Sequence, residues 1–283
     1  LLFVHGGPGL TWMPFAQKAY QWELEKEFIV VHWDQRGAGK SFAPGVLHDV
    51  LESDDFVDDT VAVTEWLIKR LARHKIILVG HAWGSYLGAM AVKKRPDLYS
   101  HYVGVSQMTD NPETERLSYE WVLKRANDEG DAEALRDLET IGPPPYKDGE
   151  AAFELQREWL IHYQGFIHKP WTQRRMLQRY FLCPQYSLFE SVFRFLPGLE
   201  ESNALLSPQV SSSNLLKDLA SLQIPATYIY GLNDHACPPD PLVKALPTFS
   251  HPAKIIRMED AAHFPHLEEP EEFARVLRDL HLH

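Results

Sequence analysis

The stretch Gly80-His81-Ala82-Trp83-Gly84 decides how the rest of this 283-residue sequence is interpreted. It follows an apolar, β-branched run at residues 76–79 and precedes a segment rich in small residues at 85–95. It therefore predicts a sharp turn from a buried strand into a helix. Turns of this kind follow the pattern Gly-x-Ser-x-Gly, in which the serine hydroxyl serves as a nucleophile. Here the middle residue is Ala82, whose methyl group can neither attack a carbonyl carbon nor give up a proton.

The composition is that of a globular protein. The length of 283 residues suits one large domain with an insertion or two modest domains, and the hydrophobic fraction of 45% allows a sizeable core to be buried. The net charge of −11 argues against nucleic acid or an anionic membrane surface as the main partner. Cys183 and Cys237 are far apart and the histidines show no metal-ligand spacing, so we expect neither a disulfide framework nor a metal site.

The sequence also bears on location. No apolar run reaches the length of a membrane span, and a cytoplasmic location is the expectation. The sequence opens on Leu1 rather than on a methionine, so we expect a segment to precede it, and a removed targeting sequence stays open. Nothing in the sequence indicates the oligomeric state.

Strand-like and helix-like runs alternate at both ends of the sequence. We expect strands at residues 1–4, 28–33, 76–79, 102–105, 226–230 and 253–258, and helices at 12–27, from Ser53 onward, and at 85–95, 240–246 and 271–280. Between about 110 and 221 the alternation gives way to helix formers and aromatic residues. The sequence thus predicts the α/β class, with a mostly parallel sheet, helices on both faces and a helical cap inserted after the fourth visible strand. The core would comprise residues 1–109 and 222–283, and the cap residues 110–221.

Residues able to do chemistry follow four of the expected strands. The loop His5-Gly6-Gly7-Pro8-Gly9 lets backbone N–H groups approach a substrate, although a plain tight turn explains it equally well. Asp234 and His263 follow the last two strands, and singly they are explained by a polar turn and a surface histidine. In the order turn, acid, histidine they favour a triad in which Asp234 orients His263 toward position 82. The N–H groups of Gly7 and Trp83 would then form an oxyanion hole.

Together with Trp33-Asp34-Gln35-Arg36-Gly37-Ala38-Gly39-Lys40-Ser41, these motifs resemble the prolyl aminopeptidase (proline iminopeptidase) group of the α/β-hydrolase superfamily. The resemblance covers roughly the first 105 and the last 60 residues. It implies a serine hydrolase that releases an N-terminal residue, typically proline, from a short peptide or small amide or ester through an acyl-enzyme, without metal or cofactor. It also implies structural roles for Asp34 and Arg36. The sequence departs from the group at Ala82, and it lacks the one or two strands expected before the His5 loop.

The resemblance also implies that glutamates of the cap hold the free amine of the substrate. Glu190, Glu200 and Glu201 are the candidates, and a solvated helix face explains each of them as well. The density of aromatic residues in the cap predicts an apolar pocket to which Trp171 and Phe166 contribute, with most of the other aromatics in a helical core.

Three explanations of Ala82 stay open. We favour an engineered Ser→Ala variant of a working hydrolase, inactive as written, because every partner of the missing serine persists. The second is a natural homologue that binds a small molecule without hydrolysis. The third is a lyase, isomerase or cofactor-free oxygenase that uses His263 and Asp234 as a general base.

Overall fold

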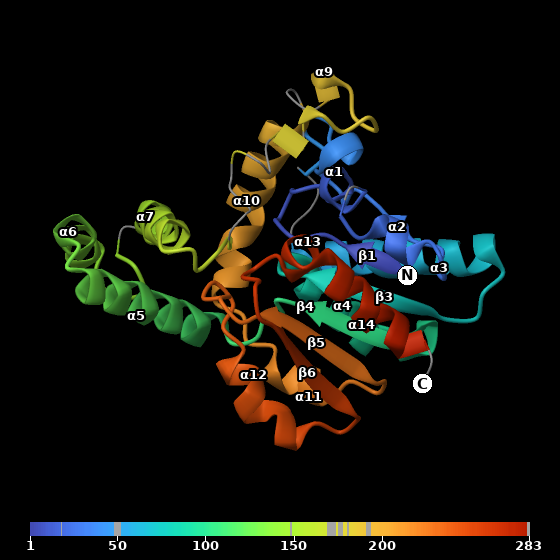
Figure 1. Ribbon diagram of the computed structural model, residues 1–283. Helices are drawn as coiled ribbons and strands as arrows, with labels where there is room; N and C mark the ends of the chain where they lie inside the picture. The colour runs from blue at the N-terminus through green and yellow to red at the C-terminus, as the bar shows by residue number, and fades with distance from the viewer. Residues whose placement is uncertain are drawn as a thin grey trace.

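The computed structural model describes all residues except 18, 48–51, 148, 169–173, 175–177, 180, 191–193 and 282–283. Its strands form one six-stranded sheet in the order β2-β1-β3-β4-β5-β6, and each neighbouring pair is parallel (Figure 1). This arrangement confirms the predicted parallel sheet. The strands are β1 (Leu2–Val4), β2 (Val31–His32), β3 (Ile76–His81), β4 (Tyr99–Val105), β5 (Ala226–Gly231) and β6 (Ala253–Met258).

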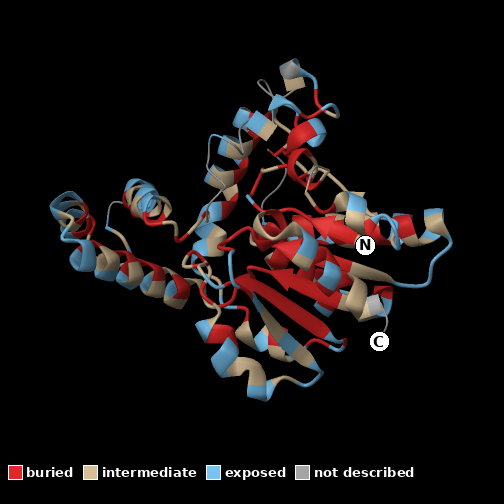
Figure 2. Ribbon diagram, viewed as in Figure 1, coloured by how far each residue is buried: buried red, intermediate tan, exposed pale blue. Residues whose placement is uncertain are grey.

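Helices cover both faces of the sheet because successive strand side chains point to opposite faces. Leu2 and Val4 contribute to one hydrophobic core, whereas Phe3 between them contributes to the other. The first core lies under α3 (Ser53–Leu71), α4 (Trp83–Lys94), α11 (Leu216–Ala220) and α12 (Asp240–Ala245). The second lies under α1 (Met13–Ala16), α2 (Gln21–Leu24), α13 (Pro265–Glu268) and α14 (Pro270–His281). Figure 2 shows the strands buried between these layers.

The helical insertion lies between β4 and β5, as the sequence predicts. It contains α5 (Asn111–Glu129), α6 (Ala132–Ile141), α7 (Gly149–His162), α9 (Leu188–Glu190) and α10 (Leu196–Ser211). The helices α5 to α7 extend away from the sheet and share a small core of their own around Val122, Leu138 and Leu160 (Figure 1). The segments that enter and leave the insertion pair with each other through a bridge between Asp110 and Asn214. Single turns of 3₁₀ helix complete the fold at η1 (Gly39–Ser41), η2 (Pro96–Leu98) and η4 (Leu246–Thr248).

Residues 12–27 do not form the single helix expected from their amphipathic pattern. They form the one-turn helices α1 and α2, with a turn between them. Trp12 and Tyr20 are buried on the sheet, and the Trp12 Nε1–H donates to the Tyr20 hydroxyl at 2.9 Å. Burial of these large rings decides the local path, because tertiary contacts override weak helix propensity.

The second strand is shorter than expected, and the fourth begins three residues earlier, at Tyr99. The second strand is limited to Val31 and His32, because the short β1 offers only Leu2 and Phe3 as partners. Helix α3 begins at Ser53, as expected, and Glu52 is its N-cap residue. The side chains of Glu52 and Asp55 form a reciprocal capping box, which satisfies N–H groups at the start of the helix.

Among the described residues, none of the helices combines the length and the apolar character that crossing a membrane requires.

Close backbone contacts fix the turn between β3 and α4. A Cβ atom added to Gly84 would lie 2.1 Å from the Val4 carbonyl oxygen, and one added to Gly80 would lie 2.3 Å from the Gly84 carbonyl oxygen. Because the obstructing atoms belong to backbone, they cannot rotate away. The two glycines therefore allow α4 to begin directly against the end of β1.

We predict that Gly84→Ala lowers the free energy of unfolding by about 3 kcal/mol, the upper part of the range for overpacked sites. The control is Gly130→Asn at the end of α5, where a Cβ atom meets nothing within 4 Å and the left-handed backbone suits asparagine. Denaturant-induced unfolding of both variants measures the difference. Equal losses would show that the Gly84 contact does not limit the turn.

Candidate active site

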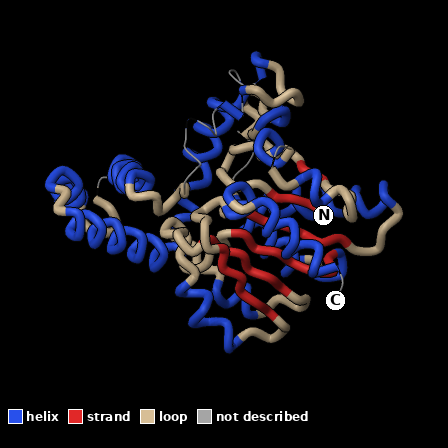
Figure 3. The backbone as a smooth tube through the Cα atoms, in the orientation of Figure 1, coloured by secondary structure: helices blue, strands red, loops and turns tan. Residues whose placement is uncertain are grey.

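The loops that follow β1, β3, β4, β5 and β6 gather at one end of the sheet. The insertion emerges from the same end (Figure 3). All the strands run in the same direction, so their carboxyl ends share one edge, which is where functional loops collect in such sheets. Residues from distant parts of the sequence are thereby brought together.

Ala82 lies at the sharpest point of the turn between β3 and α4. Its backbone has φ 47° and ψ −117°, a conformation that a residue with a Cβ atom rarely adopts. The Ala82 N–H donates to the Val105 carbonyl at 3.0 Å, and the Ser85 N–H donates to the Ala82 carbonyl at 2.8 Å. Strain of this kind costs about 1–3 kcal/mol and persists only where the surroundings over-determine it. The surroundings thus hold the turn in a strained conformation, with alanine at its most strained position.

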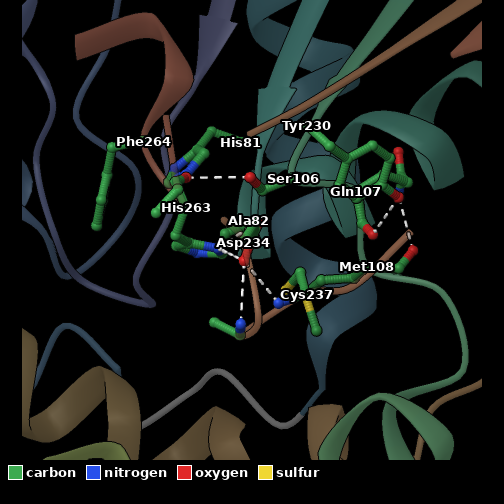
Figure 4. Close-up of polar contacts among 12 residues, drawn as sticks. His81, Ala82, Ser106, Gln107, Met108, Tyr230, Asp234, Cys237, His263 and Phe264 are labelled. Carbon is green, nitrogen blue, oxygen red and sulfur yellow. Dashed lines mark hydrogen bonds and ion pairs between the residues drawn. The ribbon is translucent and has the colours of Figure 1, made fainter. Parts of the chain in front are cut away.

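Asp234 and His263 meet as the sequence predicts. The His263 Nδ1 lies 3.2 Å from Asp234 Oδ2 and 3.3 Å from Oδ1, and both side chains are buried (Figure 4). The Asp234 Oδ1 also accepts from the N–H groups of Ala236 at 3.1 Å and Cys237 at 2.8 Å. These bonds fix the carboxylate within its own loop, so that it can orient the imidazole.

The pair is electrostatically coupled. Burial of the imidazole opposes its protonation, but the Asp234 carboxylate, together with the Cys237 side chain, outweighs burial and raises the pKa of His263 above its usual range. Burial alone would raise the pKa of Asp234, but the charge and hydrogen bond of His263 hold it below its usual range. The carboxylate therefore stabilises an imidazolium, as an acid–base partner must when the histidine accepts a proton.

Two residues that the sequence analysis did not single out hold the backbone of His263. Its carbonyl oxygen lies 2.8 Å from His81 Nε2 and accepts from the Ser106 hydroxyl at 3.0 Å (Figure 4). Ser106 directly follows β4, so the strand-end rule used for the other loops would have indicated it. Glu268 was also missed, and its carboxylate accepts from the N–H groups of Ala262 and Phe264.

The glycine loop after β1 is tied to the turn by Gln35. The Gln35 Nε2–H donates to the His5 carbonyl at 2.8 Å, and the Trp83 Nε1–H donates to Gln35 Oε1 at 3.0 Å. Gly7 has φ 121°, which leaves this loop in a conformation that favours glycine. Trp83 begins α4, where N–H groups have no partner within the helix. Both N–H groups proposed for the oxyanion hole thus belong to segments connected through one side chain.

The two motif residues expected to be structural have partners that fit this role. The Asp34 carboxylate accepts from the Tyr186 hydroxyl at 2.7 Å and from the Lys40 N–H at 2.8 Å. Arg36 forms a bidentate ion pair with Asp59 at 2.7 and 2.9 Å. Both motif residues therefore stabilise loops rather than present a free charge.

The candidate cap residues have different surroundings. Glu200 and Glu201 are exposed on α10, and Glu190 accepts from the N–H and hydroxyl groups of Ser187 at 2.8 and 3.0 Å. The Phe166 ring stacks on the His263 ring, with centroids 4.9 Å apart. Trp171 lies outside the described residues. No cluster of three or more histidine, cysteine or acidic side chains in the described part of the chain is placed to hold a metal ion.

Comparisons with known proteins agree with this geometry. Residues 1–276 match the model of the alpha/beta hydrolase family. The chain is 32% identical to a probable aminopeptidase, YbaC, of Bacillus subtilis, over 98% of this chain and 87% of that protein. It is 23% identical to a proline iminopeptidase of Heyndrickxia coagulans, over 99% of this chain and 89% of that protein. The crystal structure of a proline iminopeptidase from Mycobacterium smegmatis superposes with a TM-score of 0.64 at 18% identity, covering 99% of this chain and 87% of that one.

Neutral histidines lie beneath the site. The His266 ring is buried 4.7 Å from the His81 ring and 4.5 Å from the Trp12 ring. Burial lowers the pKa of His81 to about 3 and that of His266 far below its usual range, because a charge there would lose its hydration. In the unfolded chain these histidines bind protons below about pH 6.5, so acid stabilises the unfolded state. Glu268 has the opposite effect, because burial raises its pKa to about 7 in the folded chain. Below that pH the folded chain binds a proton on Glu268 that the unfolded chain does not yet bind.

We predict that His266→Phe flattens the loss of stability in acid, because the unfolded chain then binds one proton fewer. Each such histidine lowers the free energy of unfolding by about 1.4 kcal/mol for every pH unit below its unfolded pKa. Denaturant-induced unfolding at about pH 7 and about pH 5 measures the slope. His74→Phe at an exposed position is the control and should leave the slope unchanged. A slope for His266→Phe equal to that of the parent chain would contradict the prediction.

Proposed function

Because the chain belongs to the α/β-hydrolase family, we propose that its site is that of a serine hydrolase of the prolyl aminopeptidase type. Such a site cleaves the amide or ester that follows the N-terminal residue of a short peptide or small molecule. The observation that carries this proposal is the strained backbone retained at Ala82, beside a buried Asp234–His263 pair. The engineered or natural replacement of serine by alanine removes only the covalent step.

Each group has a role in this mechanism. With a serine at position 82, its hydroxyl oxygen attacks the substrate carbonyl while His263 Nε2 takes the proton. Asp234 holds Nδ1–H and stabilises the imidazolium. The N–H groups of Gly7 and Trp83 donate to the oxyanion. His263 then protonates the leaving amine or alcohol, and water releases the acyl group by the same route in reverse.

The substrate class rests on the relatives. One is named a probable aminopeptidase and the other a proline iminopeptidase. A free N-terminal amine on the substrate would need an acidic partner in the insertion. Glu200 and Glu201 have exposed side chains on α10 and fit this requirement better than Glu190, which bonds to Ser187.

A second candidate function is favoured by Ala82 itself. A natural homologue without a nucleophile would bind a small molecule, or would use His263 as a base without acylation. If this second function is correct, the chain with Ala82 binds or converts its ligand without any substitution. Turnover that is lost in His263→Ala would identify the base, and ligand binding that survives His263→Ala would identify a binding protein.

We predict that Ala82→Ser raises hydrolysis by about 10⁴-fold or more, because the nucleophile carries rate enhancement of this order. Proline arylamides, other amino-acid arylamides and simple esters are the substrates to assay. Ala72→Ser is the matched control, because Ala72 also has a left-handed backbone, at φ 49°, and lies on the surface away from the site. The proposal fails if Ala82→Ser gains no rate on any of these acyl substrates.

We further predict that the acid limb of the kcat/KM profile of Ala82→Ser lies above pH 6.5, the ordinary pKa of histidine. The imidazole must be neutral to accept a proton, and Asp234 raises the pKa of that imidazole. Adding Asp234→Asn should move the limb to lower pH, because burial then acts without the carboxylate. Asp260→Asn removes the same charge at an exposed position and should leave the limb in place. A limb unmoved by Asp234→Asn would contradict the assignment of the pair.

A further inference from the structure

We propose that Glu268 is a positioning residue for His263, and that it links the catalytic loop to the helical insertion. This inference rests on the proposed function, because the position of His263 matters for rate only if His263 is the base. Glu268 acts together with residues 165–168 of the insertion.

The Glu268 carboxylate holds the residues on both sides of His263. Its Oε2 accepts from the Ala262 N–H at 2.8 Å and from the Phe264 N–H at 3.2 Å. Glu268 is the last residue of α13, the short helix that follows the histidine loop. Its side chain therefore turns back toward the start of that helix and fixes the peptide groups from which the imidazole projects.

The other carboxylate oxygen reaches the insertion. Glu268 Oε1 accepts from the His168 N–H at 2.5 Å. Two residues earlier, the Phe166 carbonyl accepts from the His263 N–H at 3.2 Å, and the Phe166 ring lies on the imidazole. The Glu268 side chain thus joins the insertion to the loop that carries His263, beside the direct contact between Phe166 and His263.

The same segment also contacts the acid loop. The Gly165 carbonyl accepts from the His235 N–H at 2.9 Å, and His235 directly follows Asp234. The His235 ring stacks on Trp121 of α5, with centroids 4.0 Å apart. A Cβ atom added to Gly165 would lie 2.7 Å from the Trp121 ring, so the segment passes close beneath α5. Residues 165–168 of the insertion therefore contact both the loop that carries Asp234 and the loop that carries His263.

The ionised carboxylate is the form of this side chain that can satisfy all three contacts. Three N–H donors converge on Glu268, and a carboxylate offers only acceptors. An amide at this place must direct its NH₂ group at one set of donors, so at least one of the three bonds is lost. Burial raises the pKa of Glu268, the three donors lower it, and the Asp234 charge raises it further, to about 7 in total.

The test combines rate with a direct view of the imidazole. In the Ala82→Ser background, we expect Glu268→Gln to lower kcat on the order of 100-fold while KM changes little, because misplacement of a catalytic group affects the chemical step. In the chain with Ala82, we expect Glu268→Gln to shift the NMR titration of the His263 ring. That signal is identified by its loss in His263→Gln.

The matched control is Glu269→Gln, which makes the same change one residue further on. Glu269 accepts from the Asp260 N–H at 3.1 Å and makes no bond to residues that flank His263. It should leave kcat and the His263 signal unchanged. Equal effects of the two substitutions, or an unchanged kcat and His263 signal in Glu268→Gln, would overturn the inference.

A second variant covers the case in which Glu268→Gln does not fold. Compared with His168→Ala, which also loses the imidazole but keeps the N–H, His168→Pro removes the donor on the insertion side and fixes φ there, while no residue of α13 changes. It should shift the His263 signal, although His168 is not a neighbour of His263 in sequence, and an unchanged signal would overturn the link to the insertion. If Ala82→Ser is inactive on every acyl substrate, the proposed function fails, and the NMR measurements still decide whether Glu268 positions the imidazole.

Discussion

The buried pair of Asp234 and His263 is the interaction on which the arrangement of the site depends. A carboxylate removed from water is stable only when its oxygens are satisfied, and here two backbone N–H groups and the imidazole do so. The two residues are 29 positions apart in sequence. They meet because β5 and β6 are parallel neighbours whose register runs to their carboxyl ends, where Gly231 pairs with Met258. The Asp234–His263 pair therefore forms because β5 and β6 run parallel and end at the same edge of the sheet.

The parts of this structure that sequence could predict are those that local pattern controls. Apolar runs such as residues 76–79 and 226–230 identified central strands. The rule that loops collect at strand ends brought Asp234 and His263 together. The one-turn helices α1 and α2 were not predictable, because burial of Trp12 and Tyr20 decides that segment. Glu268 was not predictable either, because its bonds reach backbone N–H groups, which have no sequence signature. The ring of Phe166 was expected in a substrate pocket, and aromatic density alone could not show that it lies on His263.

The insertion differs from the sheet in the way it is stabilised. Its helices α5, α6 and α7 share their own apolar core, and its entry and exit meet at the bridge between Asp110 and Asn214. The segment at 165–168 connects the insertion to the loops of Asp234 and His263. The insertion also contacts the rest of the chain through Leu206 of α10, which lies in the first hydrophobic core, and through the bond from Tyr186 to Asp34. A change in the position of residues 165–168 would therefore move the loops that carry Asp234 and His263.

The backbone at Ala82 has a consequence for how such a site is inherited. The turn keeps its shape because Gly80, Gly84 and the neighbouring strands leave the chain no other path, and not because a hydroxyl needs it. The backbone conformation at position 82 is therefore determined by neighbouring residues that would not themselves react with a substrate. If the proposed function is correct, the site without a nucleophile cannot hydrolyse its substrate but can still bind it. The substrate would then stay bound and uncleaved, whereas a chain with serine at position 82 would hydrolyse it.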